Sequence, residues 1–241
     1  MSEMVTSKRL GAVAALLAMV TGFTSCLKTE NTTPSRPVAA FVVINGISSG
    51  AKLDFYDNST KIKDSVSTGF AGYNYQAYGG THIFELKRYA TGTTVVSTSA
   101  ATYDSLNYYT LVAYGDSTSP VFYPIKDTEF SGANNANLNI RFWNLSSNIG
   151  PVDLYLNSTK VDSNVTYSLS RPTAVFKALT TVSTATSITV KKAGTSTVVA
   201  TNNSSTTQLT TGGVYTIFLT GDVNTTTGSL APYVGYIKSY Y

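Results

Sequence analysis

Hydrophobic and polar residues alternate with a period of two along much of the chain after Cys26. In KLDFYDNSTKIKDSV, Leu53 and Phe55 lie on one face of a predicted strand, and Asp54 and Tyr56 lie on the other. Similar runs of four to nine residues are rich in Val, Ile, Thr, Tyr and Phe and are bounded by Gly, Asn, Ser or Asp, as is typical of strands. No stretch after Cys26 has the apolar spacing of an amphipathic helix over three turns. The pattern therefore predicts an all-β protein.

The strand-like runs occur at about seven per hundred residues, which indicates β-sandwiches of the immunoglobulin-like kind. They read AAFVVIN, THIFELKR, TTVVSTS and NYYTLVAYG, and later NLNIRFWN, TSITVKK, STVVATN and GVYTIFLTG. Thr and Ser fill many of the outward positions, where their hydroxyls bond water without adding charge. We therefore expect the outer faces of the sheets to lie in water.

One stretch of the chain occurs twice. DFYDNSTKI, at positions 54–62, returns as DLYLNSTKV at 153–161, and YTLVAYGD at 109–116 returns as YTIFLTGD at 215–222. A period near 100 residues far exceeds the 20 to 50 of solenoid repeats, so it predicts tandem duplication of a whole domain. Asn and Asp tolerate left-handed backbone conformations, and we interpret the repeated NST as the tip of a hairpin.

These patterns divide the chain into four segments. We expect a signal peptide at 1–25, a tether at 26–37, a first β-sandwich repeat at 38–130 and a second at 131–241. The tether sequence KTENTTPSRP is polar and contains two prolines, which predicts an extended conformation. KDTEFSGANNAN, at 126–137, is the predicted linker, and the sequence leaves open whether the repeats pack together or hinge there.

The N-terminal segment has the pattern of an export signal. Lys8 and Arg9 precede the uncharged run Leu10 to Val20, which is shorter than the roughly 20 residues of a transmembrane helix. Cys26, the one cysteine of the chain, follows FTS, and this arrangement resembles the lipobox of bacterial lipoproteins. The resemblance implies cleavage before Cys26, lipidation of its thiol, and a membrane partner reached through that lipid anchor. The alternative is an ordinary secretory peptide with an incidental cysteine.

The residue after the cysteine bears on the destination of the protein. Leu27 stands where many inner-membrane lipoproteins of diderm bacteria have Asp, so the resemblance implies lipid anchoring at the outer membrane, on its periplasmic face or at the cell surface.

Charge argues against nucleic acid as a partner. Charged residues make up 12% of the chain, and 17 Lys and Arg against 13 Asp and Glu leave a net charge of +4. The basic pairs at 61 and 63, 87 and 88, and 191 and 192 belong to different predicted strands. Binding to phosphates requires a cluster of such residues, so we expect no nucleic-acid binding.

The sequence lacks the usual signatures of catalysis. His82, the one histidine, lies in the predicted strand THIFELKR, and no nucleophile motif surrounds any Ser. Zinc requires several His or Cys ligands, and neither glycine-rich phosphate-binding motif is present. We therefore expect no cofactor, no metal and no enzymatic activity, with an envelope hydrolase as the least favoured class.

Four carboxylates recur at equivalent places. Asp54 and Asp153 lie in the repeated hairpin, and Asp116 and Asp222 each follow a Gly. Carboxylates can perform acid–base chemistry, or bind calcium in a loop such as GDVNTTTG. Each occurs singly in its copy, however, and duplication of the fold explains the recurrence.

Tyrosines are the candidate binding residues. YNYQAY places Tyr73 and Tyr75 on one strand face, and further tyrosines occur near the C-terminus, at 233, 236, 240 and 241. Exposed tyrosines can stack on sugar rings or anchor a protein partner, whereas strands also favour Tyr for ordinary packing. Clustering on an open face would favour a glycan-binding protein, and burial between the sheets would favour a scaffold.

Three short motifs resemble sites of a bacterial O-glycosylation system. They are DSV, DSL and DST, which contain Ser65, Ser105 and Ser117. We treat modification of these three serines as a hypothesis.

Several motifs resemble the bacterial domain of unknown function 4397. They are Asn144 after a hydrophobic strand, VDLY at 152–155, Lys160 with Val161, and YTIFLTG at 215–221, with a weaker set in the first copy. The resemblance implies a β-sandwich in an exported, lipid-anchored protein without established activity. We therefore predict a non-enzymatic structural or binding module of the cell envelope, with a glycan-binding surface lipoprotein as the alternative.

Overall fold

The computed structural model describes residues 36–127, 130, 132–168 and 171–239. Within them the secondary structure consists of strands and turns, and no α-helix occurs. Residues 37–241 form one compact unit. We refer to residues 38–126 as the first half and to residues 138–239 as the second half.

The first half contains two four-stranded sheets and a short strand pair. Its inner sheet has the order β10-β9-β1-β4 and its outer sheet the order β3-β2-β6-β7, while β5 pairs with β8. The strands are β1 (Val38–Ser48), β2 (Leu53–Asp57), β3 (Thr60–Lys63), β4 (Phe70–Tyr78), β5 (Gly80–His82), β6 (Phe84–Arg88), β7 (Thr94–Ser97), β8 (Ala101–Tyr103), β9 (Tyr108–Asp116) and β10 (Val121–Lys126).

The second half repeats this strand order. Its inner sheet, read in the same direction, has the order β20-β19-β11-β14, and its outer sheet has the order β13-β12-β16-β17, while β15 pairs with β18. The strands are β11 (Leu138–Asn144), β12 (Val152–Leu156), β13 (Thr159–Val165), β14 (Lys177–Leu179), β15 (Thr184–Ala185), β16 (Ile188–Lys192), β17 (Val198–Asn202), β18 (Leu209–Thr210), β19 (Val214–Thr220) and β20 (Tyr233–Ser239).

The register of the central strands is also the same in the two halves. β1 runs parallel to β9, and β11 runs parallel to β19, whereas the other pairings between named strands are antiparallel. Val42 pairs with Thr110 in the first half, and Arg141 pairs with Thr216 in the second. The two halves therefore place these residues at equivalent positions.

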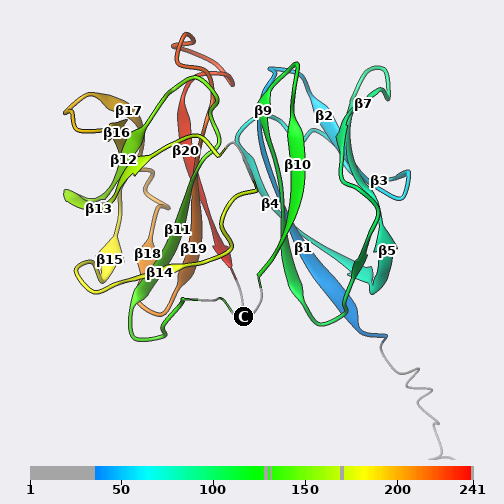
Figure 1. Cartoon of the computed structure of the whole chain (residues 1–241), viewed down its shortest axis with the longest axis horizontal. Coiled ribbons are helices and arrows are strands. Elements are labelled where there is room, and N and C mark those ends of the chain that lie inside the picture. The colour runs from blue at the N-terminus through cyan, green and yellow to red at the C-terminus, as the bar shows by residue number, and fades with distance from the viewer. Residues whose placement is uncertain (1–35, 128–129, 131, 169–170, 240–241) are drawn as a thin grey trace, which may run out of the picture. The chain divides into compact units, whose positions relative to one another are not determined.

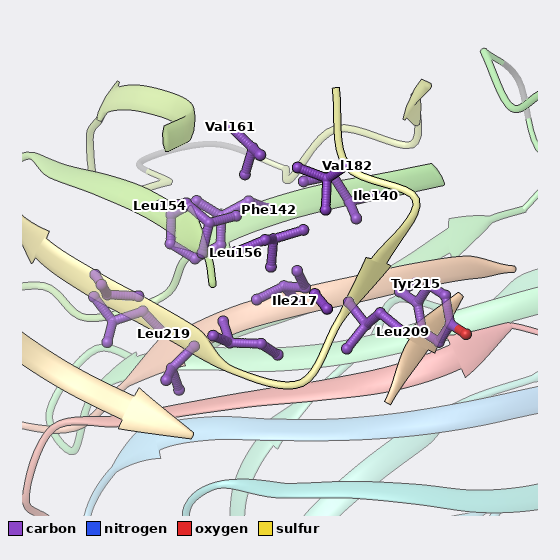
Figure 2. Close-up of a cluster of buried hydrophobic side chains, with 14 of the residues drawn as sticks. Ile140, Phe142, Leu154, Leu156, Val161, Val182, Leu209, Tyr215, Ile217 and Leu219 are labelled. Atoms are coloured by element: carbon purple, nitrogen blue, oxygen red, sulfur yellow. The ribbon is translucent and has the colours of Figure 1, made fainter. Parts of the chain in front are cut away.

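Each half has its own hydrophobic core between its inner and outer sheets. The first core is rich in aromatic rings, with Phe41, Phe55 and Phe84 fully buried. The second core is largely aliphatic, and Figure 2 shows Leu154 and Leu156 within it. These two cores confirm the predicted all-β class and the β-sandwich architecture.

The outer faces of the two inner sheets do not lie in water, which corrects our expectation. They pack against each other through a third core, and Figure 1 shows the two inner sheets between the two outer sheets. Its fully or almost fully buried members are Ile44, Val112, Tyr114, Ile125, Trp143, Leu145 and Phe218. Strands β11 and β19 are buried along their whole length because both of their faces are covered.

The predicted signal peptide and most of the tether, including Cys26 and Leu27, lie outside the described residues. Within the part of the chain that the structure describes, no helix is long and apolar enough to cross a membrane.

Candidate functional site

The repeated aspartates hold their hairpins together. Asp54 lies in β2, is almost fully buried, accepts a hydrogen bond from the Ser65 backbone NH at 3.1 Å and pairs with Lys61 at 3.0 Å. In the second half, Asp153 accepts the Asn164 backbone NH at 2.9 Å and pairs with Lys160 at 3.2 Å.

These bonds have an electrostatic consequence in the second half. The NH of Asn164, followed by the NH of Gly194 and the Lys160 ammonium, lowers the pKa of Asp153 against the opposing effect of its burial. The ionised carboxylate is thus the form that the fold stabilises.

Asparagines stabilise the hairpin tips, and they do so alike in both halves. Asn58 and Asn157 both have a positive φ, 46° and 52°, as the repeated NST predicted. The Asn58 side chain donates to the Thr81 carbonyl and accepts the Ile83 NH, and the Asn157 side chain donates to the Thr184 carbonyl. Each tip is therefore attached to the strand pair that follows it.

A tyrosine corner also occurs in both halves. The Tyr109 hydroxyl accepts the backbone NH of Asp104 at 3.1 Å, and the Tyr215 hydroxyl accepts that of Thr210 at 3.1 Å. A tyrosine that bonds the backbone a few residues upstream is a recurrent feature of immunoglobulin-like sandwiches. The recurring residues of the sequence thus mark structural bonds that recur.

The loop aspartates Asp116 and Asp222 lie at turns. Asp116 accepts the backbone NH groups of Thr118 and Ser119, and Asp222 accepts the NH of Asn224 and the side-chain amide of Asn148. The pKa of Asp116 is lowered chiefly by a hydrogen bond from the Thr118 hydroxyl and then by these NH groups, and the pKa of Asp222 is lowered chiefly by the NH of Asn224. No group of three His, Cys, Asp or Glu that could hold a metal is found among the described residues.

His82 belongs to a buried polar cluster in the first core. Its Nδ1 lies 2.8 Å from Asp57 Oδ2, and its Nε2 lies 2.9 Å from the Tyr78 carbonyl oxygen. The Tyr75 hydroxyl donates to Asp57 Oδ2 at 2.7 Å, and the imidazole stacks on Phe84 with ring centroids 5.6 Å apart. Both imidazole nitrogens contact protein oxygens, so His82 links β5 to Asp57 of β2 and to the end of β4.

The structure places the predicted tyrosine platform differently from the sequence. Tyr75 is half-buried, and its ring packs on Phe41 and Phe55 in the first core, so it does not lie on an open face. The reason is register, because Tyr75 lies opposite Phe41, and β4 has an extra residue between Tyr75 and Gly72. Tyr73 lies in β4, but its side chain is outside the described residues, as are Tyr240 and Tyr241.

A buried arginine joins the two halves. Arg141 Nη1 lies 2.6 Å from Asp127 Oδ1, and both side chains are 5% exposed or less. Arg141 also donates to Thr110 Oγ1 at 3.0 Å and to Thr216 Oγ1 at 2.8 Å. Its guanidinium lies 4.5 Å from the ring centroids of Trp143 and Phe176. Burial lowers the pKa of Arg141, and the Asp127 carboxylate opposes that shift.

The predicted linker is held against the second half at Asp127, which pairs with Arg141. Lys126 ends β10, Asp127 is buried, and the nearby Phe130 packs with Phe176 in a small cluster of its own. Direct bonds also connect the halves at the other end of the interface, where Thr220 donates to the Gly46 carbonyl at 2.8 Å. The halves are therefore packed together within the described residues.

Beyond the Arg141 network lies a groove with a volume of about 570 Å³, which we call the inter-half groove. Ala40, Val42, Ala71 and Gly72 line it from β1 and β4, where small side chains leave space. The remaining lining residues are Asn74, Tyr108, Tyr109, Thr110, Asp127, Asn202, Ser204, Thr206, Thr207, Tyr233, Tyr236, Ile237, Lys238 and Ser239.

Two tyrosine rings stand open at this groove. Tyr108 is 44% exposed and Tyr233 is 45% exposed, whereas Tyr236 is half-buried and donates to the Thr206 carbonyl at 3.2 Å. Partial burial, with a smaller contribution from Tyr236, raises the pKa of Tyr233, so its hydroxyl is protonated at neutral pH. The sequence drew attention to Tyr233 and Tyr236 but gave no signal for Tyr108, which lies in an otherwise buried strand.

The three serines of the glycosylation motifs differ in exposure. Ser65 and Ser117 are exposed and lie outside the strands, whereas Ser105 is half-buried and donates to the Pro37 carbonyl at 3.0 Å. Modification of these serines stays a prediction.

Comparison with known protein families gives a match to part of the chain. A domain of unknown function, DUF4397, is found over residues 39–155. The DUF4397 match begins in β1 and ends in β12, so it covers the first half and the opening strands of the second. No curated protein matches the chain at significant similarity.

Proposed function

We propose that the chain is an exported, lipid-anchored protein of the cell envelope, in which two duplicated β-sandwiches form a non-enzymatic structural or binding module. The proposal rests on the hydrogen bonds and ion pairs that the recurring polar residues make. Asp54 and Asp153, like Tyr109 and Tyr215, make the same structural bonds in both halves. Their recurrence is thereby accounted for by architecture rather than by chemistry on a substrate.

The duplication rests on agreement at two levels. The halves have the same strand order and the same parallel central pair, and the matching bonds fall on residues offset by 99 or 106 positions in the sequence. Independent origins would not be expected to reproduce the bonds and the sequence spacing together.

The anchor rests on the sequence. The basic pair Lys8 and Arg9, the apolar run and Cys26 form the export and lipidation signal. A lipidated Cys26 would hold the sandwiches at the membrane through acyl chains, since each buried methylene contributes about 0.8 kcal/mol. Leu27 supports the outer membrane as the destination.

Metabolic labelling in a diderm host tests this proposal. Cells that express the full chain are given an alkyne fatty acid, and their membranes are then separated into inner and outer fractions. We expect the wild-type protein to carry the label in the outer membrane, and Cys26→Ser to lose the label. Label on Cys26→Ser, or an unlabelled wild-type protein released from the membranes, would refute the anchor.

Leu27→Asp serves as the matched variant for localisation. We expect it to keep the label and move to the inner membrane. Retention of Leu27→Asp at the outer membrane would contradict the sorting part of the proposal while leaving the anchor intact.

A further inference from the structure

The inter-half groove lies where side chains of the two inner sheets no longer fill the space between these sheets. Near Trp143 and Phe218, large side chains from both sheets close the interface. Farther along, β1 contributes the smaller side chains of Ala40 and Val42, and β20 of the second half contributes Ile237 and Ser239. The floor of the groove is therefore largely apolar, and its volume of about 570 Å³ is that of an ordinary ligand pocket.

The exposed rings come from different halves and lie toward opposite ends of the groove. Tyr108 pairs with Ala40 near the start of β1, whereas the Tyr233 ring lies against Gly69, which bonds the Asn45 carbonyl farther along β1. Tyr108 belongs to β9 of the first half, and Tyr233 begins β20 of the second. Each ring leaves nearly half of its surface open, although an aromatic ring gains free energy when it is covered. A ligand that covers these rings and bonds their hydroxyls would gain contact area at a small cost in side-chain entropy.

The polar lining is neutral in character. Asn74, Ser204 and Thr206 are exposed at the groove and offer amide and hydroxyl groups. Asp127 lies in the lining, but its carboxylate is bonded to Arg141 and Thr110. Lys238 also has a partner. The groove therefore offers tyrosine faces and neutral hydrogen-bonding groups, and the charge of the Asp127 carboxylate is already balanced by Arg141.

We propose that the inter-half groove binds a neutral oligosaccharide, with different sugar units stacking on the exposed rings of Tyr108 and Tyr233. A sugar presents an apolar C–H face to an aromatic ring and a ring of hydroxyls to amides and hydroxyls. This is the combination that the groove offers. The inference rests on the proposed function as a binding module and names its ligand class.

An array experiment tests the inference. The mature lipidated chain, in detergent, is applied to neutral hexose and N-acetylhexosamine oligosaccharides, to uronic and sulfated oligosaccharides, and to a peptide array. We expect retention on neutral oligosaccharides, and Tyr108→Ala or Tyr233→Ala to weaken it about tenfold or more. Tyr89→Ala is the matched control, because Tyr89 is 57% exposed and does not line the groove, and its binding should be unchanged.

A second variant separates loss of a ring from loss of the fold. Ala40→Phe introduces a large ring into the floor of the groove while both tyrosines remain. We expect this variant to lose retention on the neutral oligosaccharides. A blank array, retention of anionic sugars or peptides alone, or unchanged binding by Tyr108→Ala and Tyr233→Ala would overturn the proposal. Membrane labelling of the same variants should match the wild type, so failure of the groove and failure of the anchor are distinguishable.

Discussion

The two halves of the molecule share their structural bonds but differ in what fills their cores. Tyr109 and Tyr215 make the same corner, yet the cluster of Asp57, His82 and Tyr75 exists in the first half alone among the described residues. By strand register, Leu156 takes the place of Asp57 in the second half.

The neighbouring positions change together. Counted from the carbonyl that each tip asparagine bonds, Thr81 or Thr184, Ala185 of β15 stands where the first half has His82. The strand pairings place Lys177 of β14 where the first half has Tyr75. Lys177 does not enter a polar cluster but donates to the Val161 carbonyl at 2.6 Å. A buried polar group is tolerated when its partners are present, so loss of the carboxylate goes with loss of the imidazole.

The comparison shows which residues carry the architecture. The hairpin carboxylates, the tip asparagines and the corner tyrosines satisfy backbone groups where strands end, and these bonds recur in both halves. The core interior varies in composition because hydrophobic filling of suitable volume preserves a fold.

The largest expected effect concerns the contact between the halves. Arg141→Val introduces the residue found at the equivalent position 42 and leaves Asp127 buried without its cation. We expect a loss of about 3 to 5 kcal/mol in the free energy of unfolding, measured by urea denaturation. Arg171→Ala, which removes an exposed arginine that donates to the Pro124 carbonyl, is the control and should cost less than about 1 kcal/mol. An equal effect of the two variants would contradict the role of the network.

A smaller effect is expected when the first core is given the residues of the second. Asp57→Leu leaves the His82 imidazole and the Tyr75 hydroxyl without their acceptor, and we expect a loss of about 2 to 4 kcal/mol. Adding His82→Ala should recover about 1 kcal/mol or more of that loss, because the unsatisfied group is removed. If the losses in unfolding free energy of Asp57→Leu and His82→Ala simply add in the double variant, the cluster does not act as a unit.

The smallest expected effect concerns Asp153, the hairpin aspartate of the second half, and depends on pH. Because the pKa of Asp153 is lowered in the folded protein, its stabilisation is complete above the unfolded pKa of about 4 and disappears as pH falls through the folded pKa. Asp153→Asn should therefore cost about 1 kcal/mol at neutral pH and flatten the loss of stability in acid, measured as urea midpoints from neutral pH downward.

The control for this experiment is Asp104→Asn, since the Asp104 side chain is 66% exposed. It should leave the acid limb of the stability curve unchanged. An acid limb in Asp153→Asn identical to that of the wild type would contradict the assignment.

The sequence predicted the strands and the hairpin tips because these depend on local periodicity and on turn residues such as Asn58 and Asn157. It did not predict the third core, although a signal was present. VYTIFLT contains the uninterrupted apolar run IFL, as is typical of strands buried on both faces, whereas LNIRFWN alternates from Leu138 to Phe142. The charge of Arg141 concealed this burial, since arginine usually lies at the surface.

The site was predicted less well, for physical reasons. The position of Tyr75 depends on its pairing with Phe41 and on the register shift of β4, which alternation alone does not reveal. The inter-half groove combines Tyr108 with Tyr233, residues that are brought together by packing between sheets and not by proximity in the chain. Neither the register nor that packing is encoded in a local pattern.

The position of Arg141 has a consequence for symmetry. Arg141 bonds both Thr110 of the first half and its counterpart Thr216 of the second, whereas the equivalent position 42 holds Val. An arginine at position 42 would pair with Thr110, which Arg141 already bonds, and two positive charges would share one space. Because the two halves belong to one polypeptide, one half can carry the arginine and the other Val42. A single chain thus permits an asymmetric centre that a dimer of identical chains could not hold.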